Sequence, residues 1–178
     1  MAKPGFDFKK MILASLLVIG IGAVLVILSV VLRLISMVVT DPDITGILDI
    51  IVIAYTVLLF PVFLVIYFWA GMRAAGAYGF DAVGAGAVSA FSSLVVGVIQ
   101  LVLNMLLTLV VVARPLESSG FGTLESSLAA SLFGGMMGLK GVGLTAVCGA
   151  GVVLFGALIN FVVGGFGGLF ALRKYSSS

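Results

Sequence analysis

Three side-chain amides lie inside long apolar stretches and are the polar groups most able to act specifically there. Gln100 and Asn104 are four residues apart, so they share one face of a helix, and Asn160 lies in a later apolar stretch. An amide without a hydrogen-bond partner in hydrocarbon costs several kcal/mol, so these groups must face protein or water. We expect Asn160 to complete an interhelical polar network with Gln100 and Asn104. The alternative is a polar path for a small solute.

One basic and one acidic residue extend furthest into the apolar stretches. Arg33 and Asp49 lie at comparable distances on either side of the Asp41-Pro42 turn, so they could pair across a helical hairpin. Charges within a membrane are functional candidates, but an arginine near a helix end extends its head group to the interface at low cost. We predict an interfacial structural pair, with a solvated pair or a functional role as alternatives.

The composition provides little catalytic or metal-binding chemistry. The chain has no histidine and one cysteine, Cys148, which removes any zinc site, disulfide framework or histidine-based acid/base machinery. The acidic residues Asp41, Asp43 and Asp49 gather near one turn, which is more typical of a capped helix than of a cation site. We therefore expect no enzymatic activity, no cofactor, no metal ion and no nucleic-acid partner.

The bulk composition places the chain in a lipid bilayer. Of the 178 residues, 62% are hydrophobic and 9% are charged, and the mean hydropathy is +1.39. A water-soluble domain is nearer half apolar and about a quarter charged. Such a chain cannot cover its surface with polar groups, which excludes a soluble fold and, for the same reason, a disordered chain.

Four apolar stretches are each long enough to cross the membrane. A bilayer core about 30 Å thick requires roughly 20 apolar residues in a helix. We place the spans at about 11–33, 47–71, 84–112 and 143–171, within one domain covering 1–178. The apolar runs are continuous and do not alternate with polar residues, which favours helices over a β-barrel. The predicted fold is an all-α membrane protein with four transmembrane helices in an antiparallel up-down bundle.

Two irregularities modify this bundle. Pro61 lies in the middle of the second span, removes one backbone hydrogen bond and should kink that helix. Between the third and fourth spans, Thr123 could cap a helix, and apolar residues recur every four positions from Leu124 to Met136. We predict a short amphipathic helix here, on the outer membrane surface. At the turn between the first two spans, Asp43 is the expected cap of the second helix.

The distribution of basic residues predicts the orientation. Six of them fall at one end of the spans and three at the other, namely Lys3, Lys9, Lys10, Arg73, Arg173 and Lys174 against Arg33, Arg114 and Lys140. Basic residues are enriched on the cytoplasmic side, so we predict cytoplasmic termini and a location in the plasma membrane. Tyr67, Phe68 and Trp69 lie at the inner end of the second span, where an aromatic belt is expected.

Small residues recur in stripes that suit close helix packing. Lipid tails are as apolar as leucine, so helix association in a bilayer depends on small residues and interhelical hydrogen bonds. These stripes comprise Ser15, Gly22 and Ser29 in the first span, Gly97 in the third, and Gly156, Gly164 and Gly168 in the fourth. We therefore expect the protein to form a homo-oligomer or to pack against other membrane proteins.

The residues 70–76 (AGMRAAG) and 81–87 (DAVGAGA) form the inner hairpin between spans two and three. This hairpin resembles that of small glycine-rich four-span prokaryotic membrane proteins, mostly archaeal, of unknown function. The resemblance implies a four-helix membrane fold, and it brings no activity or site residues with it. The leading functional hypothesis is a non-enzymatic structural or accessory subunit, or scaffold, embedded in the lipid bilayer. The alternative is a small oligomeric channel or transporter whose polar path is lined by the third helix.

Overall fold

The computed structural model describes residues 8–39, 41–113 and 124–176, which form four helices and no strand. The helices are α1 (Phe8–Val38), α2 (Pro42–Tyr78), α3 (Ala82–Ala113) and α5 (Leu124–Ser176). Each contains a segment long enough and apolar enough to cross a membrane. In its described residues, the protein is therefore all-helical and has the character of an integral membrane protein.

The ends of α2 are set by local backbone and side-chain chemistry. The Asp41 carboxylate accepts a hydrogen bond from the backbone N–H of Asp43 at 3.0 Å, and Pro42 occupies the first turn. Asp41, rather than the expected Asp43, is thus the N-cap, because proline at the first helical position needs no hydrogen bond for its nitrogen. The helix continues through Pro61 and ends at Tyr78, and it is followed by the C-cap Gly79, whose φ of 69° suits a residue without a Cβ. The kink at Pro61 stays a prediction.

The fourth helix corrects one expectation about the connection between spans three and four. A helix begins at Leu124 as predicted, but α5 runs on without interruption to Ser176, over 53 residues. The prediction of a separate short helix ending at Met136 is therefore wrong. The chain contains no proline between these ends, and glycine costs only about 1 kcal/mol in a helix against about 3 for proline. The side chains of 124–136 lie outside the described part, and so does any amphipathic face there.

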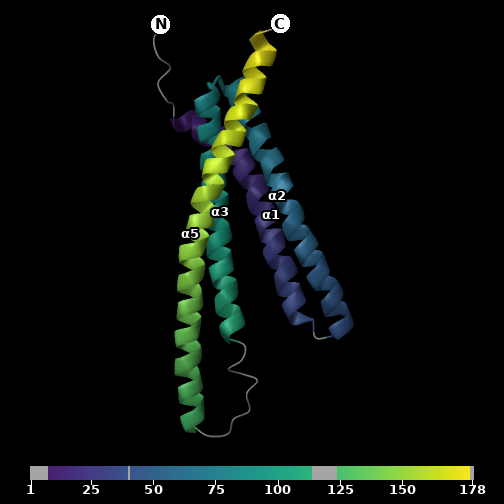
Figure 1. The fold of residues 1–178 in the computed structure, drawn as a ribbon, viewed down its shortest axis with the longest axis vertical. Coiled ribbons are helices and arrows are strands. Elements are labelled where there is room, and N and C mark those ends of the chain that lie inside the picture. Colours follow the sequence, from purple (N-terminus) through teal and green to yellow (C-terminus); the bar gives the residue numbers. More distant parts are fainter. Residues whose placement is uncertain (1–7, 40, 114–123, 177–178) are drawn as a thin grey trace.

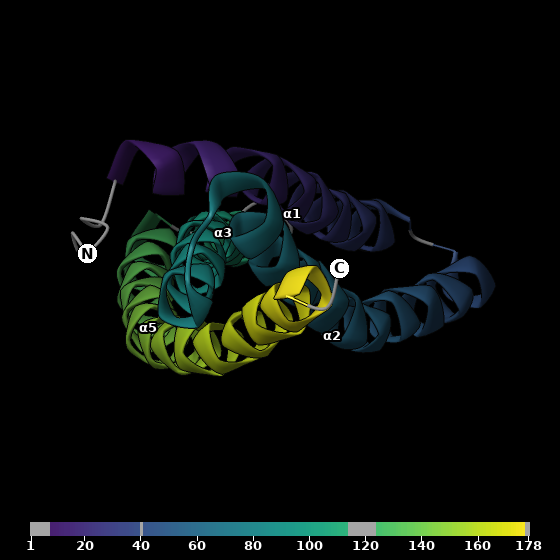
Figure 2. The same cartoon turned by 90° about the horizontal axis from the view of Figure 1, so that it is seen from above.

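The four helices run alternately up and down, and both termini lie at the same end of the molecule (Figure 1). Seen from above, α1 and α5 lie on opposite sides of α3, which contacts all three other helices (Figure 2). Towards the other end, the pair α1 and α2 diverges from the pair α3 and α5 (Figure 1). The fold is therefore closely packed near the termini and open between the two pairs at the far end.

The buried core is small and lies mainly in the closely packed half. Ala74, Ala85 and Val88 are fully buried, and Met11 and Ala14 pack with them. Most large aliphatic and aromatic side chains instead point outwards. This pattern suits a protein in lipid, where exposed leucine carries no penalty and small residues allow helices to approach closely.

Candidate functional site

Glycines allow α5 to cross α2 and α3 with backbones in contact. A Cβ added at Gly71 of α2 would overlap the backbone carbonyl of Gly164, and one at Gly164 would overlap the side chain of Ser89 on α3. A Cβ at Gly168 would lie 2.5 Å from the Cβ of Ala85. The predicted stripe residues Gly164 and Gly168 thus lie at the helix crossing. Gly71 was not singled out beforehand, and it supplies the opposite face of this contact.

The stripe on α1 is in contact with α3 over part of its length. Ser15 is fully buried, but its hydroxyl donates to the carbonyl of Met11 in its own helix, at 2.8 Å. A Cβ at Gly22 would lie 2.6 Å from Val96 of α3. Ser29 is half-buried. The first two stripe residues therefore face the core, and the third is only partly covered.

Two further glycines of the stripes differ in their surroundings. A Cβ at Gly97 of α3 would lie 2.9 Å from Val153 of α5, so this glycine permits contact between these two helices. A Cβ at Gly156 would meet no atom within 4 Å. Gly156 therefore leaves open space on α5, and this space belongs to the groove described below.

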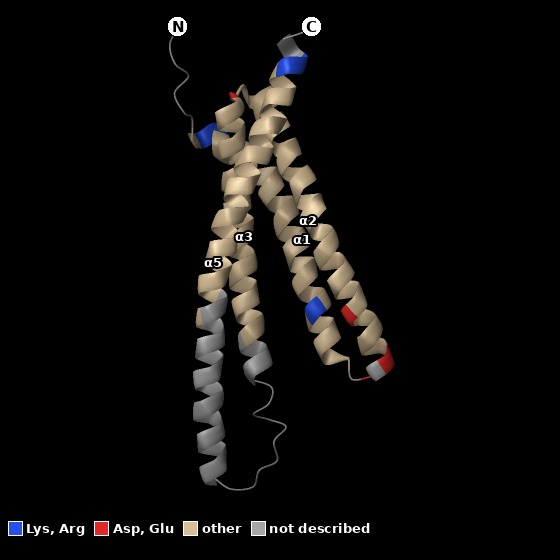
Figure 3. Ribbon diagram, viewed as in Figure 1, with Lys and Arg blue, Asp and Glu red and all other residues tan. Residues whose placement is uncertain are grey.

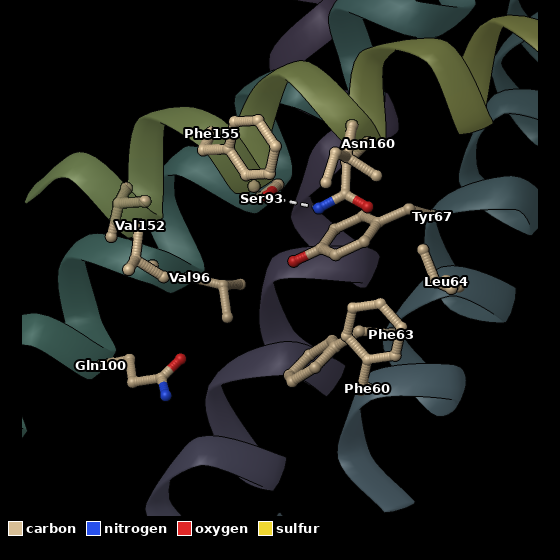
Figure 4. A pocket seen from close by; sticks show the side chains of 14 residues that line it. Phe60, Phe63, Leu64, Tyr67, Ser93, Val96, Gln100, Val152, Phe155 and Asn160 are labelled. Carbon is tan, nitrogen blue, oxygen red and sulfur yellow. Dashed lines mark hydrogen bonds between the residues drawn. The ribbon is translucent and has the colours of Figure 1, made fainter. Parts of the chain in front are cut away.

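A polar network connects α2, α3 and α5 immediately beside the crossing. The Asn160 amide nitrogen donates to the Ser93 hydroxyl at 2.7 Å, and the Tyr67 ring lies beside Asn160 (Figure 4). The Ser89 hydroxyl donates to the backbone carbonyl of Tyr67 at 2.9 Å. Two interhelical hydrogen bonds, one from α5 to α3 and one from α3 to α2, thus pair polar groups within the bundle, where an unpaired polar group is costly.

This network corrects the predicted partners of Asn160. Asn160 donates its hydrogen bond to Ser93, whereas Gln100 lies apart from Asn160 in Figure 4. The register of the antiparallel pair explains the difference. Gly164 of α5 packs against Ser89 of α3, and the two helices are antiparallel. Asn160, one turn before Gly164, therefore lies level with Ser93, one turn after Ser89. Gln100 is seven residues beyond Ser93, which is about 10 Å along the helix.

The predicted pair of Arg33 and Asp49 is likewise replaced by two separate contacts. The Arg33 guanidinium donates to the Asn104 side-chain oxygen across α1 and α3, at a long 3.5 Å. The Asp49 carboxylate accepts from the Ser36 hydroxyl at 3.2 Å. Arg33 and Ser36 are three residues apart on α1, which turns their side chains about 60° from each other. Arg33 therefore faces α3 while Ser36 faces α2.

An open groove of about 340 Å³ lies between α2 and the pair of α3 and α5. Phe60 and Phe63 of α2 form one wall, and Phe155 and Gly156 of α5 lie on the other side (Figure 4). The Asn160 network closes one end. Gln100 lines the groove from α3, is exposed, and makes no hydrogen bond with the described residues. The groove is thus mostly apolar and carries one unpaired amide.

The expected aromatic belt is only partly placed at the surface. Tyr67 is 3% exposed, and its backbone carbonyl accepts from Ser89, so its ring faces the bundle and not the surface. Trp69, two residues later, is 39% exposed. On a helix, residues two apart point in roughly opposite directions, so the two rings cannot share one environment.

Sequence reasoning placed Ser93 on the polar face of the third span with Gln100 and Asn104, but it missed Ser89 and the pairing of Ser93 with Asn160. Ser89, Ser92 and Ser93 are all buried, and Ser89 and Ser93 are four residues apart on one face of α3. Buried hydroxyls at this spacing, one turn before Gly97, were the available signal. Within the described ranges, no group of three or more His, Cys, Asp or Glu residues is placed to hold a metal ion.

The chain matches no protein-family model, no curated protein and no solved structure. Its function must therefore be argued from the arrangement of its own residues.

Proposed function

We propose that this protein is a non-enzymatic integral membrane subunit that associates with a second copy of itself through the groove between its helix pairs. The observation that carries the proposal is the Gln100 amide, which lines a mostly apolar groove without a hydrogen-bond partner among the described residues. A bundle that satisfied its polar groups internally would not leave this amide open.

The depth of Gln100 makes its missing partner costly. It lies within about 4 Å of the midpoint of α3 along the helix axis, at about 1.5 Å per residue. An amide near mid-membrane needs a hydrogen-bonding partner, which an acyl chain cannot supply. A transmembrane helix with a polar side chain supplies one, and the open space at Gly156 allows such a helix to approach closely.

A second copy fits this requirement without any additional component. A carboxamide both donates and accepts hydrogen bonds, so two Gln100 side chains can satisfy each other. Pairing of the same residue from two chains is the arrangement expected at a twofold axis, which is the commonest symmetry of oligomers. The proposed unit is therefore a dimer that buries its grooves, and other membrane proteins are the competing occupants.

The test fills the groove and compares a matched position on the same helix. Gly156→Leu places a side chain in the groove, whereas Gly151→Leu adds the same side chain to α5 where a Cβ also meets nothing within 4 Å and no groove is lined. Sedimentation equilibrium in detergent and energy transfer between labelled copies in bicelles measure association. We expect Gly156→Leu and Gln100→Leu to weaken dimerisation while Gly151→Leu does not. A monomer at every concentration, or equal effects of both leucines, contradicts the proposal.

The orientation of the dimer in the membrane is part of the same proposal. Near the end that carries the termini, Lys9 and Lys10 lie at the start of α1, Arg173 and Lys174 lie at the end of α5, and Arg73 and Asp81 lie close to the turn between α2 and α3. At the opposite end, α1 carries one basic residue and α2 carries acidic residues (Figure 3). By the positive-inside tendency, this supports cytoplasmic termini in a plasma membrane. The resemblance to glycine-rich four-span proteins also remains a prediction.

A channel lined by α3 is the competing function, and one feature favours it. Gln100, Asn104 and Arg33 follow each other from the groove towards the far end of the molecule. However, Ser93 and Asn160 bond to each other at the other end of the groove, so they offer no continuous line of open polar groups. If the channel exists, changing Gln100 and Asn104 to Leu together abolishes solute flux in proteoliposomes. Flux in the wild type that survives this change excludes that path.

A further inference from the structure

A second site lies on α2 near the end of the molecule that carries the termini, away from the groove. Arg73 is flanked by the rings of Trp69 and Tyr78, with its guanidinium carbon 5.7 Å and 6.0 Å from their centroids. Such contacts hold the charge by cation–π attraction and fix the plane of the guanidinium. They provide no hydrogen-bond acceptor for its nitrogens.

The guanidinium is left incompletely satisfied. Its Nη1 atom is buried and has no hydrogen-bond partner among the described residues. Arginine carries five N–H donors and stays charged, so a buried nitrogen of this kind is costly without an acceptor. The nearest acid along the chain is Asp81, whose carboxylate accepts from the backbone N–H of Gly84 at 2.7 Å at the start of α3. Arg73 thus carries a positive charge and at least one N–H donor that lacks an acceptor among the described residues.

A hollow beside this charge provides the space. It measures about 370 Å³ and is lined by Trp69, Met72, Arg73, Gly76 and Ala77, which form one face of α2. Gly76 and Ala77 bring little bulk, and none of the five side chains is a carboxylate. Arg73 itself lines this hollow, so its guanidinium lies where a ligand in the hollow would meet it.

The chemistry of the hollow suits a phosphate. A guanidinium binds tetrahedral oxyanions through two parallel N–H···O bonds, which a lysine cannot reproduce. Trp69 is 39% exposed, and tryptophan is enriched at the membrane–water interface, where the lipid head groups lie. Basic pockets beside transmembrane helices at this level bind anionic lipid head groups. We propose that Arg73 and its hollow bind the phosphate of an anionic phospholipid, independently of the dimer proposed above.

Trp69 is the chain's single tryptophan, so its emission reports on this site without a label. The delipidated protein in neutral detergent is titrated with short-chain phosphatidylglycerol, with phosphatidylcholine of the same chain length, and with inorganic phosphate. We expect a saturable change with phosphatidylglycerol, much less with phosphatidylcholine, and none with phosphate at equal concentration. An equal response to inorganic phosphate, or no response to phosphatidylglycerol, would overturn the proposal.

Variants separate the local site from general attraction of anions to this end of the molecule. Arg73→Gln should weaken phosphatidylglycerol binding roughly ten- to a hundredfold, the loss expected for hydrogen bonds to a charged group. Arg173→Gln removes one positive charge near the same end and should leave the affinity within about twofold, because exposed charges contribute little. Arg73→Lys keeps the charge without the fork and should bind several-fold more weakly. If Arg73→Gln does not fold, equal affinities of Arg73→Lys and the wild type would refute the site.

Discussion

The contact between Gly71 and Gly164 predicts that alanine lowers the free energy of unfolding at Gly71, whereas alanine at Gly46 of the same helix does not. In Gly71→Ala the new Cβ would lie 2.7 Å from the carbonyl carbon of Gly164, where ordinary contact begins at 3.4 Å. The obstructing atoms are backbone, so a side-chain rotation cannot relieve the overlap. The helices must separate by at least about 0.7 Å, and a gap of 0.5–1 Å forfeits roughly a quarter to a half of each packing contact.

The matched control is Gly46→Ala, at a position on α2 where a Cβ meets nothing within 4 Å. Alanine favours a helix over glycine by up to about 1 kcal/mol, so this variant should be neutral or slightly more stable. Overpacking costs about 1–3 kcal/mol, so Gly71→Ala should be less stable than Gly46→Ala by at least about 1 kcal/mol. The helix propensity gained is the same in both, and the difference isolates the crossing.

Equilibrium unfolding in mixed micelles measures the two free energies. Far-UV circular dichroism follows the helices, and the emission of Trp69, two residues from Gly71, follows the crossing itself. If Gly71→Ala is as stable as Gly46→Ala, the two backbones are not in contact at this point. The account of how α5 crosses α2 would then be refuted.

Two further predictions concern the polar network and the orientation. Ser89→Ala removes the interhelical bond to the Tyr67 carbonyl and should lower the free energy of unfolding by about 0.6 kcal/mol. Ser92→Ala removes a bond to Val88 of its own helix and should have a smaller effect, so an equal loss in both would contradict an interhelical role. In a Cys148→Ser background, a membrane-impermeant maleimide should label Asp43→Cys but not Ser178→Cys in intact cells. The reverse pattern would place the termini outside.

The helices were predictable because each is determined by the apolar composition of a single sequence segment. A charge-free run of twenty or more apolar residues in lipid must satisfy its backbone internally, and only a helix does so in a single segment. The cap at Asp41 and the length of α5 were less accessible. The identity of the cap depends on which of two nearby acids reaches a free backbone N–H. The length of α5 depends on how many glycines a long helix tolerates.

The partners of the polar residues were not predictable, because they depend on the register between helices. The spacing of Gln100 and Asn104 established that they share a face, but not which level of α5 lies opposite. That level follows from the contact of Gly164 with Ser89, which brings Asn160 to Ser93. Similarly, the position of Arg33 relative to Asp49 depends on the rotation of α1 about its own axis. The register and rotation of one helix relative to another are determined by contacts between segments, and the periodicity within one segment does not reveal them.

The same register accounts for the open end of the molecule. At the crossing, Gly71 and Gly164 allow α2 and α5 to touch, while two turns or more towards the far end α2 presents Phe63 and α5 presents Phe155 to the groove. From this crossing the two helix pairs diverge, as Figure 1 shows. The groove therefore opens beyond the glycine contact, and Gln100 lies within it because α3 keeps contact with α5 past the crossing. Shape alone would admit acyl chains there, and the unpaired amide is what makes a second helix the better occupant.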